Sequence, residues 1–404
     1  MADMTAPVHL AVALDRAGWH PAAWRDPSAT PLDLQSPAYW RALLETADRA
    51  GIVLATIEDA LSFTDRFESA DEPAAGRVRG RLDAVLIAAY AAPSTQRIGL
   101  IPTVTTAHTE PFHVATGIQT LDFASRGRAG VRLVAGSSPA ERANFGRRAS
   151  GPDGLPASLR VEDAPEFLAA FRETGEVAEV LRRLWDSWED EAIVRDEARG
   201  LFLDPDRVHP ARFEGEFFAV EGASIVPRSP QGQPLIAVLA HQRVPYLLAA
   251  ESADVVFVTP HDEGSATGIL AELDQAVAHV HRRHERLRVF ADLVVLVEET
   301  ASAARDAAAR LDDLAGAPFT SDARYVVGTP LHVVDEIRAL AASGVDGVRL
   351  RPARQPRDVV AIAERVLPLL DSFGGLRRDD RVSLRGRLGL ERPASRPLRE
   401  KVSS

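Results

Sequence analysis

The sequence predicts a (β/α)8 TIM barrel, a closed sheet of eight parallel strands surrounded by helices. Eight short β-rich segments occur along the 404 residues, and helical patterns separate them. Most of these segments are continuously apolar rather than alternating, which is typical of strands covered on both faces. A G-x-G-x-x-G fingerprint is absent after the first segment, which disfavours the alternative fold, a doubly wound open sheet.

The predicted strands and helices alternate as such a barrel requires. The strands are expected at 9–15, 52–59, 97–106, 128–137, 234–241, 254–260, 287–299 and 344–352. Helices are expected between them at 37–51, 81–92, 268–284 and 329–344, where apolar residues recur at helical spacing. We therefore expect one barrel domain over residues 1–370.

A long interval of about 138–233 separates the fourth and fifth predicted strands, and it predicts an insertion. A helix is expected over 166–192 and a hairpin in FEGEFFAVEG (213–222). We expect this insertion on the side of the strand C-termini, where the active sites of such barrels lie. The Arg-rich stretch 371–404 is expected to be an extended arm over the surface or a neighbouring subunit, or else a loose tail.

Composition restricts the possible functions. The net charge of −11 opposes general nucleic-acid binding, which needs a basic surface. The absence of cysteine excludes disulfides, thiolate metal sites and cysteine nucleophiles, and no metal site is expected. The first residues lack the pattern of a signal peptide, and no apolar run approaches the roughly 20 residues that span a bilayer. We expect a cytoplasmic protein that does not bind membranes.

Several segments, taken in order, resemble the bacterial luciferase-like flavin monooxygenases, in particular the branch of nitrilotriacetate and dibenzothiophene-sulfone monooxygenases. The resemblance covers about 8–370, and LWDSWEDEA followed by PRSPQGQP is its most specific part. The matching segments are GWHPAAWRDP (18–27), RIGLIPTVTTAHTEPFHVA (97–115), LDFASRGRAGVRLVAGS (121–137), ERANFG (141–146), RLWDSWEDEA (183–192), VPRSPQGQPLI (226–236) and GVDGVRL (344–350).

The resemblance implies a two-component enzyme. Reduced FMN, supplied by a separate flavin reductase, would react with O2 at its C4a position to give a peroxide that oxygenates a small organic substrate. The cofactor supplies this reactivity, while the protein supplies orientation and a dry cavity. A homodimer is also expected, since dimers are common in the family. Two alternatives stay open: an F420-dependent oxidoreductase, and a barrel that has lost flavin chemistry and serves as a binding or structural subunit.

The same resemblance marks four polar residues near the expected mouth of the barrel. Asp59 and Thr103 match positions that line the isoalloxazine pocket, with capping of the following helix or loop as the alternative role. His20, after the first strand, and His108, after the third, are candidate catalytic acid–base residues. Loop packing is the alternative for His20.

One strand departs from the family pattern. Arg132 stands where the relatives have an asparagine that faces the flavin. An inward guanidinium would stabilise the negative charge of reduced flavin, occupy the place of the flavin, or pair with Asp59. Glu58 is expected on the opposite face of its strand from Asp59, and therefore outside the site.

The elements that hold the flavin phosphate in the family are also altered. Ser137 lies just beyond the position of a Thr-Ser pair, and the turn His241-Gln242-Arg243 replaces a stretch containing glycine and serine. All four residues are candidate cofactor ligands, with Arg243 binding phosphate through charge-assisted hydrogen bonds. A turn without glycine keeps a phosphate farther from the backbone, which favours the reading that flavin chemistry has been lost.

Overall fold

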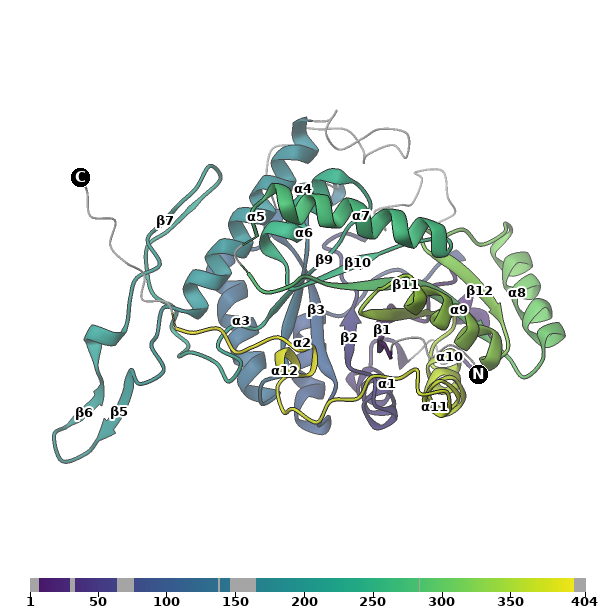
Figure 1. The fold of residues 1–404 in the computed structure, drawn as a ribbon, viewed down its shortest axis with the longest axis horizontal. Coiled ribbons are helices and arrows are strands. Elements are labelled where there is room, and N and C mark those ends of the chain that lie inside the picture. The colour runs from purple at the N-terminus through teal and green to yellow at the C-terminus, as the bar shows by residue number, and fades with distance from the viewer. Residues whose placement is uncertain are drawn as a thin grey trace.

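The computed structural model describes residues 7–29, 33–63, 76–136, 139–145, 165–282 and 284–395. Eight parallel strands close into a barrel in the order β1-β2-β3-β4-β9-β10-β11-β13, with β13 pairing back to β1 (Figure 1). The predicted TIM barrel is therefore confirmed. Its strands are β1 His9–Leu14, β2 Leu54–Ile57, β3 Gly99–Thr105, β4 Gly130–Val134, β9 Leu235–Leu239, β10 Val255–Val258, β11 Arg288–Val297 and β13 Gly347–Pro352.

Helices surround the barrel. α5 packs between α3 and α6 and so occupies the place of the helix that follows β4. The helices are α1 Pro37–Ala50, α2 Ala84–Ala91, α3 Pro111–Ala124, α4 Pro139–Asn144, α5 Pro165–Trp185, α6 Arg243–Ser252, α7 Glu263–His279, α8 Ala301–Ala315, α9 Pro330–Ala342, α10 Arg357–Ala361, α11 Leu367–Ser372 and α12 Leu384–Arg387. Within the described ranges, none of the helices is both long and apolar enough to cross a membrane.

A ninth parallel strand, β12 (Arg324–Gly328), was absent from the prediction. β11 is ten residues long, and one of its edges pairs with β10 over Arg288–Ala291 and with β12 over Leu293–Val297. Its other edge pairs with β13. The far half of β11 thus extends beyond its neighbour β10, and β12 satisfies the backbone groups exposed there.

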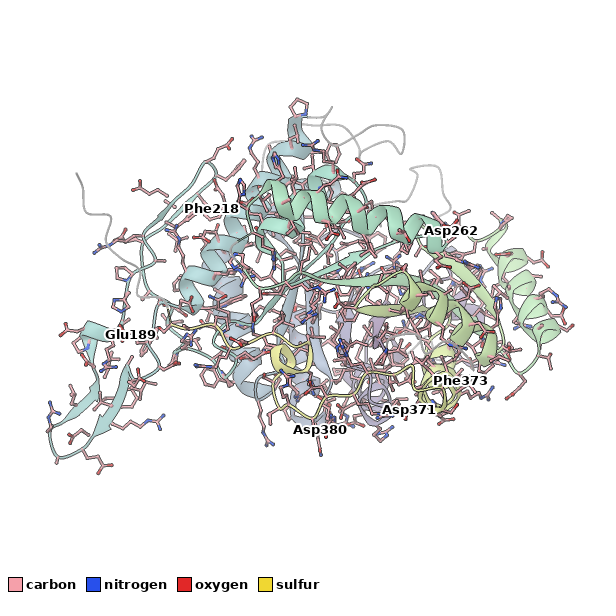
Figure 2. All side chains as sticks on the ribbon, in the orientation of Figure 1. Glu189, Phe218, Asp262, Asp371, Phe373 and Asp380 are labelled. Atoms are coloured by element: carbon pink, nitrogen blue, oxygen red, sulfur yellow. The ribbon has the colours of Figure 1, made fainter. Side chains whose placement is uncertain are left out.

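From the end of α5 onward, the described part of the insertion lies at the end of the barrel opposite to the expected one. α5 returns antiparallel to β4, so it ends beside the beginnings of β9 and β10, where Gln233 bonds Asp186 at 2.6 Å and Arg182 pairs with Asp254 at 3.1 Å. Two hairpins follow α5 in the chain, β5–β6 (Ile193–Asp196, Leu201–Leu203) and β7–β8 (Phe213–Glu214, Ala219–Val220). β5–β6 projects away from the barrel, with Glu189 where the projection begins (Figures 1 and 2).

The C-terminal segment closes the end of the barrel where the strands begin. The leucine side chains of residues 384, 388 and 390 are buried in one cluster with the innermost apolar residues of the strands. Those strand residues include Ala11, Leu54, Ile101, Ala237, Phe257 and Phe290. A Cβ on Gly99 would lie 2.5 Å from Leu384 Cδ2, so glycine at this position makes room for the leucine. We call residues 384–390 the plug.

Candidate active site at the barrel mouth

On the mouth side of the apolar strand residues that the plug covers, charged side chains fill the interior of the barrel. Arg132 on β4 pairs with Glu58 at the end of β2 and donates from Nε to Thr103 Oγ1 at 3.0 Å. Arg349 on β13 donates from Nη1 to Thr56 Oγ1 at 3.0 Å, and the same nitrogen lies 3.9 Å from Glu58 Oε1. One carboxylate therefore lies between two guanidinium groups at the floor of the mouth.

The chain of charges continues across the barrel. Asp292 on β11 accepts from Arg349 Nε at 2.7 Å and from Arg351 Nε at 2.8 Å, and all three side chains are buried. Arg351 also donates from Nη1 to Asp322 Oδ1 at 2.6 Å and lies over the ring of Trp19, 4.5 Å from its centroid. Each of these three guanidinium groups thus has an anionic partner, which offsets its removal from water.

Asp59 and Glu58 have exchanged the positions expected from the sequence. Asp59 accepts from the N–H groups of Ala60 at 2.7 Å and Ala84 at 2.9 Å, so it caps the beginning of α2, the alternative role noted above. Burial raises the pKa of the Asp59 carboxyl to about 6. Glu58, expected to face away from the site, points inward, and it rather than Asp59 is the partner of Arg132.

The structure does not bring the two candidate catalytic histidines together. His20 Nε2 lies 3.1 Å from Asp312 Oδ1, and Nδ1 accepts from the Ala22 N–H at 3.2 Å. These contacts and a ring contact with Phe319 place His20 beside α8, outside the barrel interior. His108 follows β3 and stacks on Phe145, with ring centroids 5.1 Å apart, so it does lie on the mouth side. Ser137 lies outside the described residues.

In the turn between β9 and α6, the side chains of His241 and Arg243 point to different places. His241 faces the mouth, where its Nδ1 lies 2.8 Å from Thr259 Oγ1 and its Nε2 lies 3.5 Å from Asp322 Oδ2. Gln242 is the N-cap residue of α6 but forms no side-chain capping bond. A carboxylate beside His241 disfavours a phosphate at that imidazole, because like charges repel.

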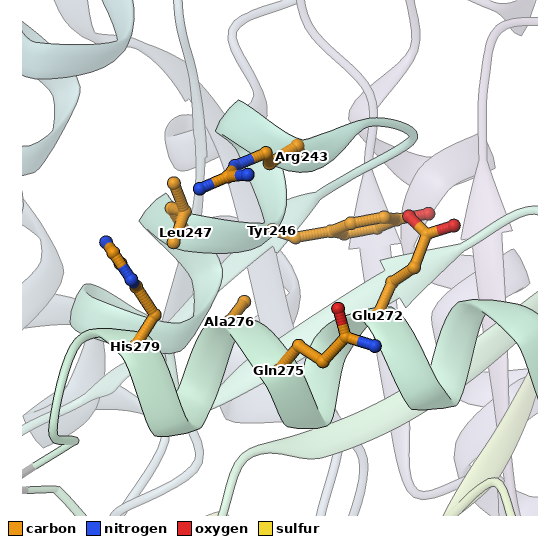
Figure 3. Close-up of a pocket in the computed structure, with 7 residues that line it drawn as sticks. All are labelled: Arg243, Tyr246, Leu247, Glu272, Gln275, Ala276 and His279. Atoms are coloured by element: carbon orange, nitrogen blue, oxygen red, sulfur yellow. The ribbon is translucent and has the colours of Figure 1, made fainter.

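Arg243 points away from the mouth. Its side chain lines a cavity of about 350 Å³ between α6 and α7, on the outer surface of the barrel (Figure 3). The cavity is lined by Arg243, Tyr246 and Leu247 of α6 and by Glu272, Gln275, Ala276 and His279 of α7. Within the described part of the chain, Arg243 has no ion-pair partner. The three side chains of the turn therefore do not converge on a single phosphate position.

The sequence profile of the luciferase-like monooxygenases matches residues 17–315. The chain belongs to the luciferase-like monooxygenase family. N-acetyl-S-(2-succino)cysteine monooxygenase of Bacillus subtilis is 27% identical over 96% of this chain and 98% of that protein. Nitrilotriacetate monooxygenase component A of Aminobacter aminovorans is 32% identical over 72% of this chain and 62% of the relative. The predicted family and branch are confirmed, and the chain is an enzyme of the monooxygenase type.

Solved structures agree on the architecture of this luciferase-like monooxygenase. A long-chain alkane monooxygenase superposes with a TM-score of 0.82 over 96% of both chains, at 22% identity. A riboflavin lyase also superposes with a TM-score of 0.82 and 22% identity, over 96% of this chain and 97% of that one. At these identities the similarity shows the fold alone.

The donors and acceptors at the mouth of this luciferase-like monooxygenase suit a reduced flavin. Glu58 Oε1 is buried and accepts no hydrogen bond from the described residues, and a flavin ring carries N–H donors. Thr103, which accepts from Arg132, keeps its own O–H for donation, and the Arg132 guanidinium offsets negative charge. Gln355, three residues after the end of β13, is 2% exposed, and its amide N and O both lack a partner among the described residues.

Most of the charged interior was not predicted from the sequence. Asp292, Arg349, Arg351 and Asp322 were not selected, although Arg349 and Arg351 alternate with apolar residues in GVRLRP. In a closed barrel this alternation places both guanidinium groups on one face, where burial requires an anionic partner such as Asp292. No group of three or more His, Asp or Glu side chains in the described ranges is arranged to hold a metal ion.

Proposed function

We propose that the protein is the oxygenase component of a two-component, FMN-dependent monooxygenase that acts on a small organic substrate. The observation that carries this proposal is the similarity to a monooxygenase over 96% of the chain and 98% of the relative. A separate flavin reductase is part of the proposal because one relative is named as component A of its enzyme. The proposal also includes a homodimer located in the cytoplasm, where reduced nicotinamide is available to the reductase.

The barrel mouth would hold the cofactor through the residues at the ends of β2, β3 and β4. Arg132 and Thr103 would donate hydrogen bonds to the flavin ring, and Glu58 Oε1 would accept one. Reduced flavin supplies the electrons that activate O2. The protein orients the ring over a buried, charged floor and keeps water from it, which strengthens each of these contacts.

The flavin phosphate would lie near the first turn of α6, where helix N–H groups lack intrahelical partners. Because Arg243 points into the cavity between α6 and α7, the backbone N–H groups at the start of α6 would bind the phosphate instead of the Arg243 side chain. We therefore expect modest affinity for oxidised FMN. Reduced FMN should bind more tightly, because Arg132 favours a negatively charged ring.

The test is an anaerobic equilibrium titration of the purified protein with FMN, reduced FMN and F420, followed by absorbance and fluorescence. Saturable binding of reduced FMN in the micromolar range is expected. Oxygenation is then followed by mass spectrometry with a flavin reductase, using nitrilotriacetate, N-acetyl-S-(2-succino)cysteine and dibenzothiophene sulfone as first substrates. Binding of F420 alone would assign a deazaflavin oxidoreductase instead. Failure to bind any of the three would assign a barrel that has lost flavin chemistry.

A further inference from the structure

Three side chains from separate parts of the chain lie in series at the mouth. Thr259 follows β10, His241 precedes α6, and Asp322 precedes β12. Thr259 Oγ1 is 2.8 Å from His241 Nδ1, and Asp322 Oδ2 is 3.5 Å from His241 Nε2. The order is hydroxyl, imidazole, carboxylate, an arrangement that fixes the tautomer of a histidine and directs its second nitrogen to the hydroxyl.

The carboxylate at the end of this series is held in place and kept ionised. Burial acts to raise the pKa of Asp322, but the neighbouring Arg351 guanidinium outweighs it and holds that pKa at about 2. Arg351 is itself fixed from the other side by Asp292, and its guanidinium stacks on Trp19. Asp322 therefore stays negative at neutral pH, and its charge 3.5 Å from His241 Nε2 favours a proton on that nitrogen. This leaves Nδ1 to exchange a proton with Thr259.

Stability alone does not account for the arrangement. The side chains of His241 and Asp322 are 40% and 41% exposed, and an ion pair at such a position contributes only about 0–1 kcal/mol. The same exposure lets His241 exchange protons with solvent between turnovers. A histidine that is oriented by a fixed anion and remains accessible to water meets the requirements for a proton donor.

We propose that Asp322, His241 and Thr259 form a proton relay that serves the oxygenation reaction. This proposal rests on the proposed function. Anionic reduced FMN, O2, substrate and one proton give oxidised FMN, the oxygenated substrate and water. The relay supplies that proton: His241 gives it up from Nδ1 to Thr259, whose hydroxyl passes its own proton to the departing oxygen. His241 is then reprotonated from solvent, so the protein returns to its starting state.

The charges around the imidazole determine the pH dependence of the relay. Partial removal from water lowers the pKa of His241, Asp322 and then Asp292 act to raise it, and Arg351 and then Arg349 act to lower it, with a net lowering. The imidazolium is the form that delivers the proton. Turnover should therefore fall as the pH rises through the pKa of His241. Replacing Asp322 by asparagine should move this fall to lower pH.

The experiment compares wild type with His241→Gln, Asp322→Asn and Thr259→Val, and uses His279→Gln on the outer face of α7 as the matched control. Affinity for reduced FMN is measured by anaerobic titration. Turnover is measured against pH, and the pKa of His241 is measured by NMR of histidine-labelled protein. We expect His241→Gln to lower oxygenation by about 100-fold or more while the Kd for reduced FMN changes less than about twofold.

Further readouts separate a relay from a structural contact. Thr259→Val should lower turnover without changing the NMR pKa, Asp322→Asn should lower both, and added imidazole should partly restore His241→Ala. Equal losses of flavin affinity and turnover in His241→Gln would overturn the relay and assign His241 to cofactor binding. Unchanged turnover in His241→Gln would overturn it as well. Failure of wild type to bind reduced FMN would instead refute the proposed function.

Discussion

Arg349 donates from Nε to Asp292 Oδ1 at 2.7 Å, and both side chains are completely buried inside the barrel. The same carboxylate accepts from Arg351, so one anion lies between two guanidinium groups. These residues form the floor between the apolar lower layer and the mouth. The interior of this barrel is thus polar where the ligand is expected and apolar where the plug closes it.

Removing the shared anion should destabilise the fold. Asp292→Asn keeps the shape of the side chain but removes the shared anion, so Arg349 retains only Glu58 at 3.9 Å and Arg351 retains only Asp322. We expect the free energy of unfolding to fall by about 3–5 kcal/mol, measured by urea denaturation. Asp306→Asn, on the exposed face of α8, is the control and should change it by less than about 0.5 kcal/mol. Equal effects of the two substitutions would show that the buried pairs contribute nothing.

The plug should contribute to stability as part of the core. Leu384 is fully buried among the innermost strand residues, so Leu384→Ala should cost about 2–5 kcal/mol. Leu331→Ala, at a leucine of α9 that is 49% exposed, removes the same atoms at the surface and should cost far less. Thermal unfolding of both variants checks this. A plug that is peripheral to the fold would leave both melting temperatures alike.

Gly99 and Leu384 should be energetically coupled. A Cβ on residue 99 would lie 2.5 Å from Leu384 Cδ2, which is too close for any real contact. Gly99→Ala should therefore cost about 1–3 kcal/mol in the wild-type background. In the Leu384→Ala background the added methyl has space, and the cost should largely disappear. A double-mutant cycle measures the difference, and additive costs would contradict the contact.

Asp59 should make stability depend on pH. Its pKa is raised from 3.8 to about 6 because the carboxyl is buried, so the folded state holds the proton more tightly than the unfolded state. The stabilisation is complete below about pH 3.8 and is lost as the pH rises through 6. Relative to Asp59→Asn, wild type should be more stable at pH 4 than at pH 7, as measured by urea denaturation at each pH. A constant difference across this range would contradict the shift.

The sequence predicted the eight barrel strands because buried parallel strands are long apolar runs between helices. It did not predict β12, since RYVVG is short and mostly only half-buried. The burial of residues 384–390 as a plug was also not predicted. Its leucines are spaced among arginines and glycines, and only the closed barrel provides the apolar surface that they cover.

The wrong face assigned to Glu58 has a physical cause. In LATI (54–57) both faces carry apolar residues, and the one polar residue, Thr56, is of a type that strands carry on either face. Nothing in the strand itself therefore marks its inner side. The contact between Thr56 and Arg349 fixes it, and Glu58 follows two residues later on the same face. The partners that reveal this lie nearly 300 residues away in the sequence.

The central claim is that the mouth lined by Arg132 and Glu58 holds reduced FMN, and anaerobic titration of three proteins tests it most directly. Wild type should bind reduced FMN saturably. The double variant Arg132→Gln/Glu58→Gln, which removes both charges together, should bind at least about tenfold more weakly, as expected for loss of a charge-assisted hydrogen bond. Arg243→Ala should bind like wild type, since Arg243 faces the outer cavity. Normal binding by the double variant together with weakened binding by Arg243→Ala would contradict the claim.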